Sequence, residues 1–233
     1  MNVLNVVALP TEVFADTNQV PRWRAPFALL VASSVVIGWF MIPAITEPLR
    51  RVYADSFGES TAETTVSTMM RYFLLLEILV EPMFKLLRWI VFAGVLYLLV
   101  LTVTRDRRKL FSRLFAITAY SESIFVLMST LTVLIIYARG LDHIEGSSDL
   151  TVFKGLDFFF PGEPSANLAL TTLLTNVNIF SVWYIITVSA GIRLITGLNR
   201  FEAVGFATIA WLIWITLSIG QPSLVKVILG ILV

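Results

Sequence analysis

The sequence predicts an all-α fold: a polytopic membrane bundle of five transmembrane helices with an additional interfacial amphipathic helix. Three observations support this class. The chain of 233 residues is 57% hydrophobic and only 14% charged, and its mean hydropathy is +0.84, which an ordinary soluble domain of this length would not show. Its apolar residues gather in runs long enough to cross a bilayer. The polar segments between these runs differ in charge, and this difference predicts which side of the membrane each segment faces.

The first predicted span covers residues 26–45. It has about the 20 residues that a helix needs to cross ~30 Å of hydrocarbon. Residues 1–25 are a polar segment that we interpret as a cytoplasmic lead-in and not as a cleaved signal peptide, because no basic stretch precedes its apolar residues. The only cations in this lead-in, Arg22 and Arg24, stand directly before the span. Residues 46–68 are polar and predict an exposed loop.

Pro82 divides the next apolar stretch, which is too long for a single span. Before this proline, residues 66–81 predict an amphipathic helix that lies along the outer membrane interface. After it, residues 83–104 predict the second span. Lys85 and Arg88 stand near its outer end, and we expect their charged groups to extend toward the interface.

The segment RDRRKLFSR, residues 105–113, sets the predicted orientation. It holds five cations and one acid in a short turn, which is where the positive-inside rule is most reliable, so we expect this turn in the cytoplasm. The third span covers residues 114–137, and the polar loop 138–167 follows on the outside. Because five spans place the two ends of the chain on opposite sides, the N-terminus is predicted to be cytoplasmic and the C-terminus outside.

The fourth predicted span covers residues 168–196, and the fifth covers residues 201–219. The turn GLNRFE joins them. Residues 220–233 follow as a short apolar tail that is too short to span. Residues 26–219 are therefore predicted to form one five-span membrane domain.

Two stretches of the chain resemble a known family. They are LFSRLFAITAYSESIFVLMSTLTVLI and NIFSVWYIITVSAGIRLITGLNRFEAVGFATIAWLIW. The first enters a span through basic residues and carries an Ala-Tyr-Ser segment. The second has a central Trp, a Gly-containing turn and a last span that opens with a charged residue and alanine. This pattern, over residues 85–218, resembles the Yip (Ypt-interacting protein) superfamily of five-span integral membrane proteins, and the resemblance implies a membrane-organising or accessory role and no enzyme activity.

Polar residues inside the predicted spans are the candidate functional groups. Glu122 is the most informative, because an ionised side chain at membrane depth costs about 2.5 to 3.5 kcal/mol on insertion scales. It is either a structural polar group, bonded to Thr118 or paired with Arg193, or a site for a proton or ligand. We predict that it faces the protein interior. Asn176 and Asn178 point to different helix faces, and each is expected to join neighbouring helices through hydrogen bonds.

Catalytic, cofactor and metal chemistry has little support in the sequence. No Gly-rich phosphate loop, Ser/His/Asp set or HExxH motif is present, and the chain has no cysteine, which removes thiol nucleophiles and thiolate metal sites. Asp142, His143, Glu145 and Asp149 are ligand types for a divalent cation, but their spacing matches no recognised motif and predicts a solvated loop. The segment FFFPGEP, residues 158–164, predicts a turn that dips into the outer interface. No catalytic, cofactor-binding or metal-binding residue is therefore predicted.

Three functions remain open. The favoured one is a non-catalytic integral membrane scaffold or accessory protein, in lipid and membrane organisation or in a transporter complex. The alternative is a small transporter or channel whose polar path includes Glu122, Asn176 and Arg193. An intramembrane enzyme has the least support, because no pair of nucleophile and base is evident. The expected partners are the lipid bilayer and other membrane proteins or a transporter complex, with no nucleic acid.

Overall fold

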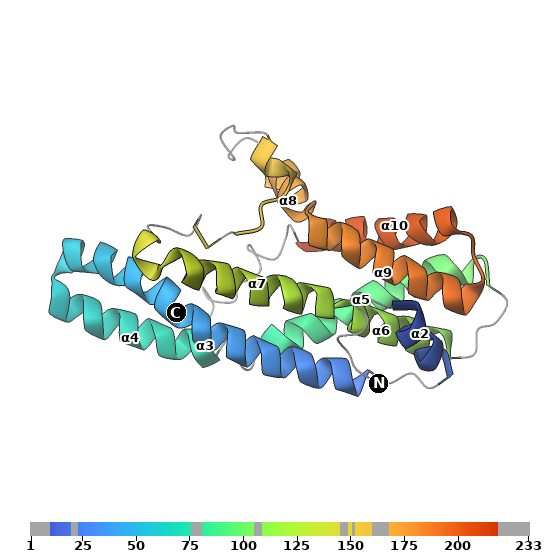
Figure 1. Cartoon of the computed structure of the whole chain (residues 1–233), viewed down its shortest axis with the longest axis horizontal. Helices are drawn as coiled ribbons and strands as arrows, with labels where there is room; N and C mark the ends of the chain where they lie inside the picture. Colours follow the sequence, from blue (N-terminus) through green and yellow to red (C-terminus); the bar gives the residue numbers. More distant parts are fainter. Residues whose placement is uncertain are drawn as a thin grey trace. The chain divides into compact units, whose positions relative to one another are not determined.

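Helices make up the regular structure of the chain. The computed structural model describes residues 10–19, 23–75, 81–104, 109–144, 149–150, 152–159 and 168–218, and within these ranges every regular element is helical (Figure 1). Among the described residues, five helical segments are long and apolar enough to cross a membrane: Arg24–Phe57, Pro82–Leu101, Leu110–Arg139, Ile179–Thr196 and Arg200–Leu217. The predicted all-α class with five spans is confirmed.

The chain divides into two compact units, which we describe separately. The first comprises Met1–Trp23, Arg88–Ser121 and Lys154–Val233, and the second comprises Arg24–Leu87 and Glu122–Phe153. Several predicted features lie outside the described residues: residues 105–108 of the basic turn, the acid Glu145, the end of the FFFPGEP segment and the apolar tail.

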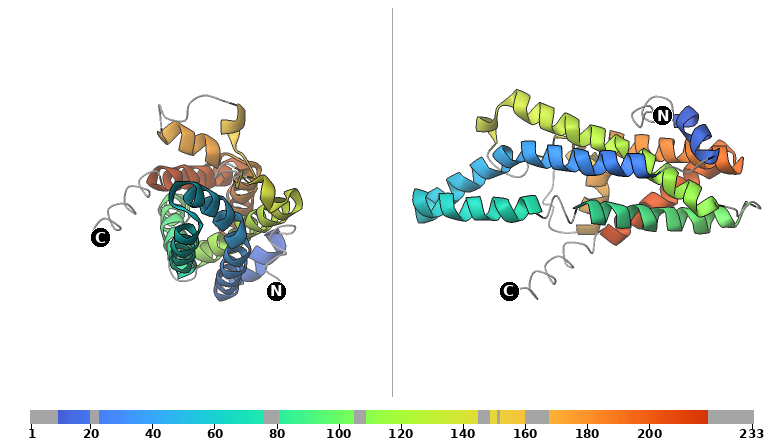
Figure 2. Two further views of the ribbon diagram at one scale, coloured as in Figure 1. Left: turned by 90° about the vertical axis from the view of Figure 1, so that its left-hand side faces the viewer. Right: turned by 90° about the horizontal axis from the view of Figure 1, so that it is seen from below.

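The second unit is built on α3 (Arg24–Phe57). Its 34 residues extend about 51 Å at 1.5 Å per residue, well beyond the ~30 Å of a hydrocarbon core. Gly58 then turns the chain with a φ of +86°, a conformation that a residue without a Cβ adopts easily. The next helix, α4 (Glu59–Leu75), returns alongside α3 (Figures 1 and 2). The prediction of an exposed loop over residues 46–68 is therefore wrong.

Charge pairs explain why α3 continues past its apolar run. Arg50 and Arg51 donate to the carboxylate of Glu47 at N···O distances of 3.3 and 3.1 Å, at the spacings where opposite charges stabilise a helix. Arg50 also reaches Glu59 of α4 at 3.4 Å, across the Gly58 turn. Such partly exposed pairs contribute less than about 1 kcal/mol each, so they support a helix that is also held by its packing against α4.

Helix α4 confirms a further helix between the first two spans, and its C-terminal part covers residues 66–75 of the range predicted to be amphipathic. In this predicted helix, Tyr72 is expected on the apolar face and Glu77 on the polar face. Tyr72 is 65% exposed, and Glu77 lies outside the described residues. The position of α4 relative to the membrane interface stays a prediction.

Lys85 lies near the start of α5 (Glu81–Leu101) and makes a contact that the sequence did not predict. Its Nζ donates a hydrogen bond to the Oγ of Ser34 on α3, at 3.1 Å, and Ser34 is buried. The extension of its charge toward the interface stays a prediction. A polar contact between two apolar helices satisfies part of the bonding capacity of an ammonium group, which would otherwise be unfavourable at membrane depth.

The remaining helices of the second unit pack on α3 as well. Helix α7 (Ser123–Arg139) lies alongside α3, and both contact the short 3-10 helix η2 (Leu141–His143). Ala44, Ile136 and Ile144 form a buried cluster where these elements meet. This cluster fixes the end of α7 against the middle of α3.

The first unit includes most of α5 and the whole of α8 (Leu168–Asn176), together with α2 (Pro10–Gln19), α6 (Leu110–Ser121), α9 (Ile179–Thr196) and α10 (Arg200–Ser218). Buried Val13 and Phe14 of α2 pack against Ile117 and Tyr120 of α6. Helices α6 and α9 are in contact and run in opposite directions (Figure 1). Part of the segment predicted as a polar lead-in therefore forms a helix whose apolar side chains belong to the core of this unit.

The predicted fourth span is divided into two helices. Residues 168–176 form α8 (Leu168–Asn176), and the helix long enough to cross a membrane begins only at Ile179. The short 3-10 helix η3 (Leu156–Phe159) packs on α8. At the other end of α9, Gly197 adopts a φ of +73°, and its N–H donates to the carbonyl of Arg193 at 2.8 Å, a common helix ending. The prediction of one continuous helix over residues 168–196 is therefore wrong.

Candidate functional site

Glu122 lies at a one-residue break between α6 and α7. It is 2% exposed, and its backbone keeps helical angles, with φ −60° and ψ −20°. Its carbonyl accepts the N–H groups of Phe125 and Val126 at 2.9 and 3.2 Å, which begins α7. The two helices therefore continue as one candidate span, and the acid is buried within it, where ionisable groups are rare.

Thr118 and Arg193 are the two residues predicted to contact the Glu122 carboxylate, and both lie among the described residues. The Thr118 hydroxyl donates to the carbonyl of Leu114 on its own helix at 3.0 Å, so it is not the donor that we expected for the carboxylate. Arg193 lies in the last turn of α9 with an exposed side chain, and it belongs to the other compact unit. The ion pair between Glu122 and Arg193 stays a prediction.

The two asparagines stand where α8 ends and α9 begins. Asn178 is the N-cap of α9: its Oδ1 accepts the N–H groups of Phe180 and Ser181, both at 3.0 Å, as asparagine commonly does at this position. Asn176 is exposed, and its Nδ2 donates to the carbonyl of Thr172 on α8 at 2.8 Å. In these contacts each asparagine shapes a helix end and does not join two spans.

The candidate polar residues of α9 do not gather at one place. Asn178 and Arg193 lie 15 residues apart on this helix, which is about 22 Å along its axis. Between them, the Ser189 hydroxyl donates to the carbonyl of Ile186 on the same helix at 2.7 Å. Asn178 and Arg193 therefore do not belong to one polar cluster.

Arg88 of α5 contacts aromatic rings, and its predicted extension toward the interface stays a prediction. Its guanidinium carbon lies 5.9 Å from the ring centroid of Tyr184 on α9 and 5.7 Å from that of Trp214 on α10. Phe92, one turn further along α5, meets Tyr184 edge to face with centroids 5.5 Å apart. Contacts of a cation with ring faces are worth about 0.5 to 2 kcal/mol, so this cluster helps to hold α5, α9 and α10 together.

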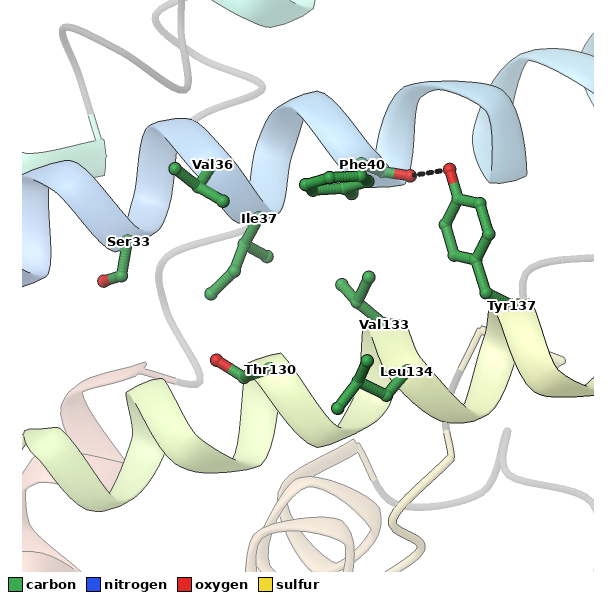
Figure 3. A pocket seen from close by; sticks show the side chains of 8 residues that line it. All are labelled: Ser33, Val36, Ile37, Phe40, Thr130, Val133, Leu134 and Tyr137. Carbon is green, nitrogen blue, oxygen red and sulfur yellow. Dashed lines mark hydrogen bonds between the residues drawn. The ribbon is translucent and has the colours of Figure 1, made fainter.

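A groove opens between α3 and α7 in the second unit, with a volume of about 270 Å³ (Figure 3). Each helix contributes four lining residues, Ser33, Val36, Ile37 and Phe40 from α3 and Thr130, Val133, Leu134 and Tyr137 from α7. The hydroxyls of Ser33 and Thr130 donate to carbonyls of their own helices, at 2.9 and 2.8 Å. The α3–α7 groove therefore presents a mainly apolar lining.

Tyr137 closes one end of the α3–α7 groove. Its hydroxyl donates to the carbonyl of Phe40 at 2.9 Å (Figure 3), and the two rings meet edge to face at an interplanar angle of 86°. These two contacts hold α3 against α7.

These elements define an integral membrane protein of the polytopic helical class. Five helices are apolar enough to span, and in the described ranges no group of three or more His, Asp or Glu could hold a metal ion. The Yip1 domain family matches residues 4–220. The chain therefore belongs to the Yip1 domain family, as the resemblance predicted. No curated protein and no solved structure matches the chain significantly.

Proposed function

We propose that this Yip1 family protein is a non-catalytic membrane scaffold or accessory protein that acts inside the bilayer, through contacts with lipids and other membrane proteins. The observation that best supports this is the use of the polar groups in its spans. The hydroxyls of Thr118, Thr130 and Ser189 donate to carbonyls of their own helices, and Asn178 caps α9. Groups used in this way shape helices, and they do not form the convergent set of nucleophile, base and charge-stabilising donors that catalysis needs.

The surfaces of the spans support the same proposal. Large apolar side chains are exposed on several helices, including Trp39 (66%), Leu98 (65%), Ile186 (54%) and Leu217 (55%). In a bilayer, such surfaces contact acyl chains or the helices of other membrane proteins. An accessory role needs this kind of surface and no catalytic group.

The buried Glu122 favours a second candidate function, a small transporter or channel. An acid at a helix break within a span is an arrangement found in ion and proton pathways. The two hypotheses differ in one measurable property, because a scaffold conducts no ion and a transporter does.

Flux through the reconstituted protein separates the two functions. The full-length protein and its Glu122→Gln variant are placed in liposomes that contain a pH-sensitive dye, and proton and potassium permeability is compared with that of protein-free liposomes. We expect no flux above this background from either protein. Flux in the wild type that Glu122→Gln abolishes would overturn the scaffold proposal. Glu63→Gln, which changes an exposed carboxylate on α4, is the matched control and should leave any flux unchanged.

A scaffold also requires a defined partner. Native mass spectrometry of the protein released from membrane nanodiscs should show lipid or protein adducts at fixed stoichiometry. A bare monomer under conditions that preserve the adducts of a known membrane complex would contradict the proposal.

A further inference from the structure

We infer that the α3–α7 groove is a binding site for one acyl chain of a membrane phospholipid. This inference deepens the proposed function by naming a lipid partner, and it rests on that function in requiring the protein to act inside the bilayer. It is argued from the position of the groove, its dimensions and its chemistry.

The groove lies where acyl chains are present. Its lining residues belong to two segments that are long and apolar enough to span, and those of α3 lie within the apolar run 26–45. Val36 is 54% exposed, Phe40 48% and Leu134 60%. The groove is therefore open on its outer side, and a bilayer around these helices presents hydrocarbon directly to it.

The dimensions fit a single narrow chain. Ser33 to Phe40 and Thr130 to Tyr137 are each seven residues apart, which is about 10 Å along a helix axis. The volume of 270 Å³ lies below the roughly 300–1,000 Å³ of pockets that hold drug-sized ligands. The length and the volume of the groove both suit a segment of one acyl chain better than a bulky ring system.

The chemistry of the lining agrees with a hydrocarbon ligand. Val36 and Ile37 face Val133 and Leu134 across the groove (Figure 3). At one end, the Tyr137 hydroxyl already donates to the Phe40 carbonyl, so it closes the groove and does not offer this proton to a ligand. A chain in the groove would supply the dispersion contacts that an unfilled space lacks.

Photolabelling of the full-length protein tests this site. The protein is reconstituted in vesicles that contain a phospholipid with a diazirine midway along one acyl chain, irradiated, and mapped by mass spectrometry. We expect label to concentrate on Ile37 and Val133 and to decrease when unlabelled phospholipid is added in excess. Ile90 and Ile186, which are 46% and 54% exposed on other helices, report ordinary contact with the bulk lipid.

Two valines of α3 provide a matched pair of variants. Val36 lines the groove and Val35 does not, although both are exposed. Val36→Trp should fill part of the groove and lower its labelling about tenfold. A tenfold change corresponds to roughly two methylene groups of the acyl chain that are no longer buried in the groove. Val35→Trp adds the same side chain one residue away and should leave the labelling unchanged. Leu134→Trp fills the groove from α7 and replaces Val36→Trp if that variant does not fold.

Two results would overturn the inference. Equal labelling of the groove and of Ile90 and Ile186, with no difference between the Val36→Trp and Val35→Trp variants, would show bulk lipid contact only. Crosslinks from a photoreactive residue at Val36 to a second copy of the chain would identify the groove as an interface between copies. Neither result changes the flux measurement, so failure of the acyl-chain site is distinguishable from failure of the proposed function.

Discussion

Replacing Gly191 with alanine tests the close packing of α9 on α6. An added Cβ would lie 2.6 Å from Cγ2 and 2.9 Å from Cγ1 of Ile117, and Ile117 is 1% exposed, so it has no free space to move into. Overpacking of this kind costs about 1–3 kcal/mol, whereas alanine gains about 1 kcal/mol over glycine in a helix. We expect the free energy of unfolding to decrease by about 1 kcal/mol.

Equilibrium unfolding in mixed detergent micelles, followed by tryptophan fluorescence, measures this change. Gly205→Ala in α10 is the matched control, because a Cβ at that position meets nothing within 4 Å. Only the helix-propensity gain then remains, so Gly205→Ala should stabilise the protein by up to about 1 kcal/mol.

A double variant shows whether Ile117 is the cause. Ile117→Ala removes the three side-chain atoms that the new Cβ would approach. In that background, Gly191→Ala should stabilise the protein, because its methyl group enters the cavity and the propensity gain is kept. Equal stabilisation by Gly191→Ala in both backgrounds would refute the close packing of α6 and α9.

Three further substitutions test other contacts through the free energy of unfolding, measured in the same way. The Thr187 hydroxyl is buried and has no hydrogen-bond partner among the described residues, so Thr187→Val should be neutral or stabilising. Asn178→Ala removes the N-cap of α9 and should destabilise by about 0.5–2 kcal/mol. Tyr137→Phe removes the hydrogen bond to Phe40 and should destabilise by about 0.5–1.5 kcal/mol.

Each of these substitutions has a control or a contrary result. Thr118→Val removes a hydroxyl that donates to a carbonyl, so it should lower the free energy of unfolding more than Thr187→Val does. A smaller decrease for Thr118→Val than for Thr187→Val would contradict the assignment of the Thr187 hydroxyl as unpaired. Asn176→Ala should be milder than Asn178→Ala, because Asn176 bonds only within its own exposed turn. A neutral Tyr137→Phe would show that the contact with Phe40 does not hold α3 against α7.

The number and order of the spans could be predicted because hydrophobic run length is a local property. Residues 26–45 have the length and composition of a span, and α3 contains them. The Ala-Tyr-Ser segment and the Gly-containing turn likewise indicated the family, because each depends on neighbours in the sequence. Features of this kind need no knowledge of which helices touch.

Helix limits were predicted less well because composition was given more weight than local stabilising signals. Residues 46–68 are polar, but Glu47 is three and four residues before two arginines, which favours a helix. Gly58 was the better signal for a turn. The predicted span 168–196 was longer than a crossing requires, and Asn178 is a common N-cap residue, so both facts together indicated a helix start near residue 179.

The candidate site was predicted least, because it depends on contacts between distant segments. The burial of Glu122 agrees with its predicted interior position, but its expected donor Thr118 bonds within α6. The α3–α7 groove joins residues about one hundred positions apart, as do Phe40 and Tyr137. No periodicity or motif in either segment identifies the other as its neighbour.

The most direct test of the whole arrangement is the sidedness of the chain, since the groove and the proposed function both require these helices to cross a bilayer. The natural chain has no cysteine, so single-cysteine variants are specific probes. In intact cells, a membrane-impermeant thiol reagent should label Ser148→Cys and should reach Ser112→Cys only after permeabilisation. Labelling of Ser112→Cys with protection of Ser148→Cys would contradict the orientation, and labelling of both in intact cells would contradict the crossing between them.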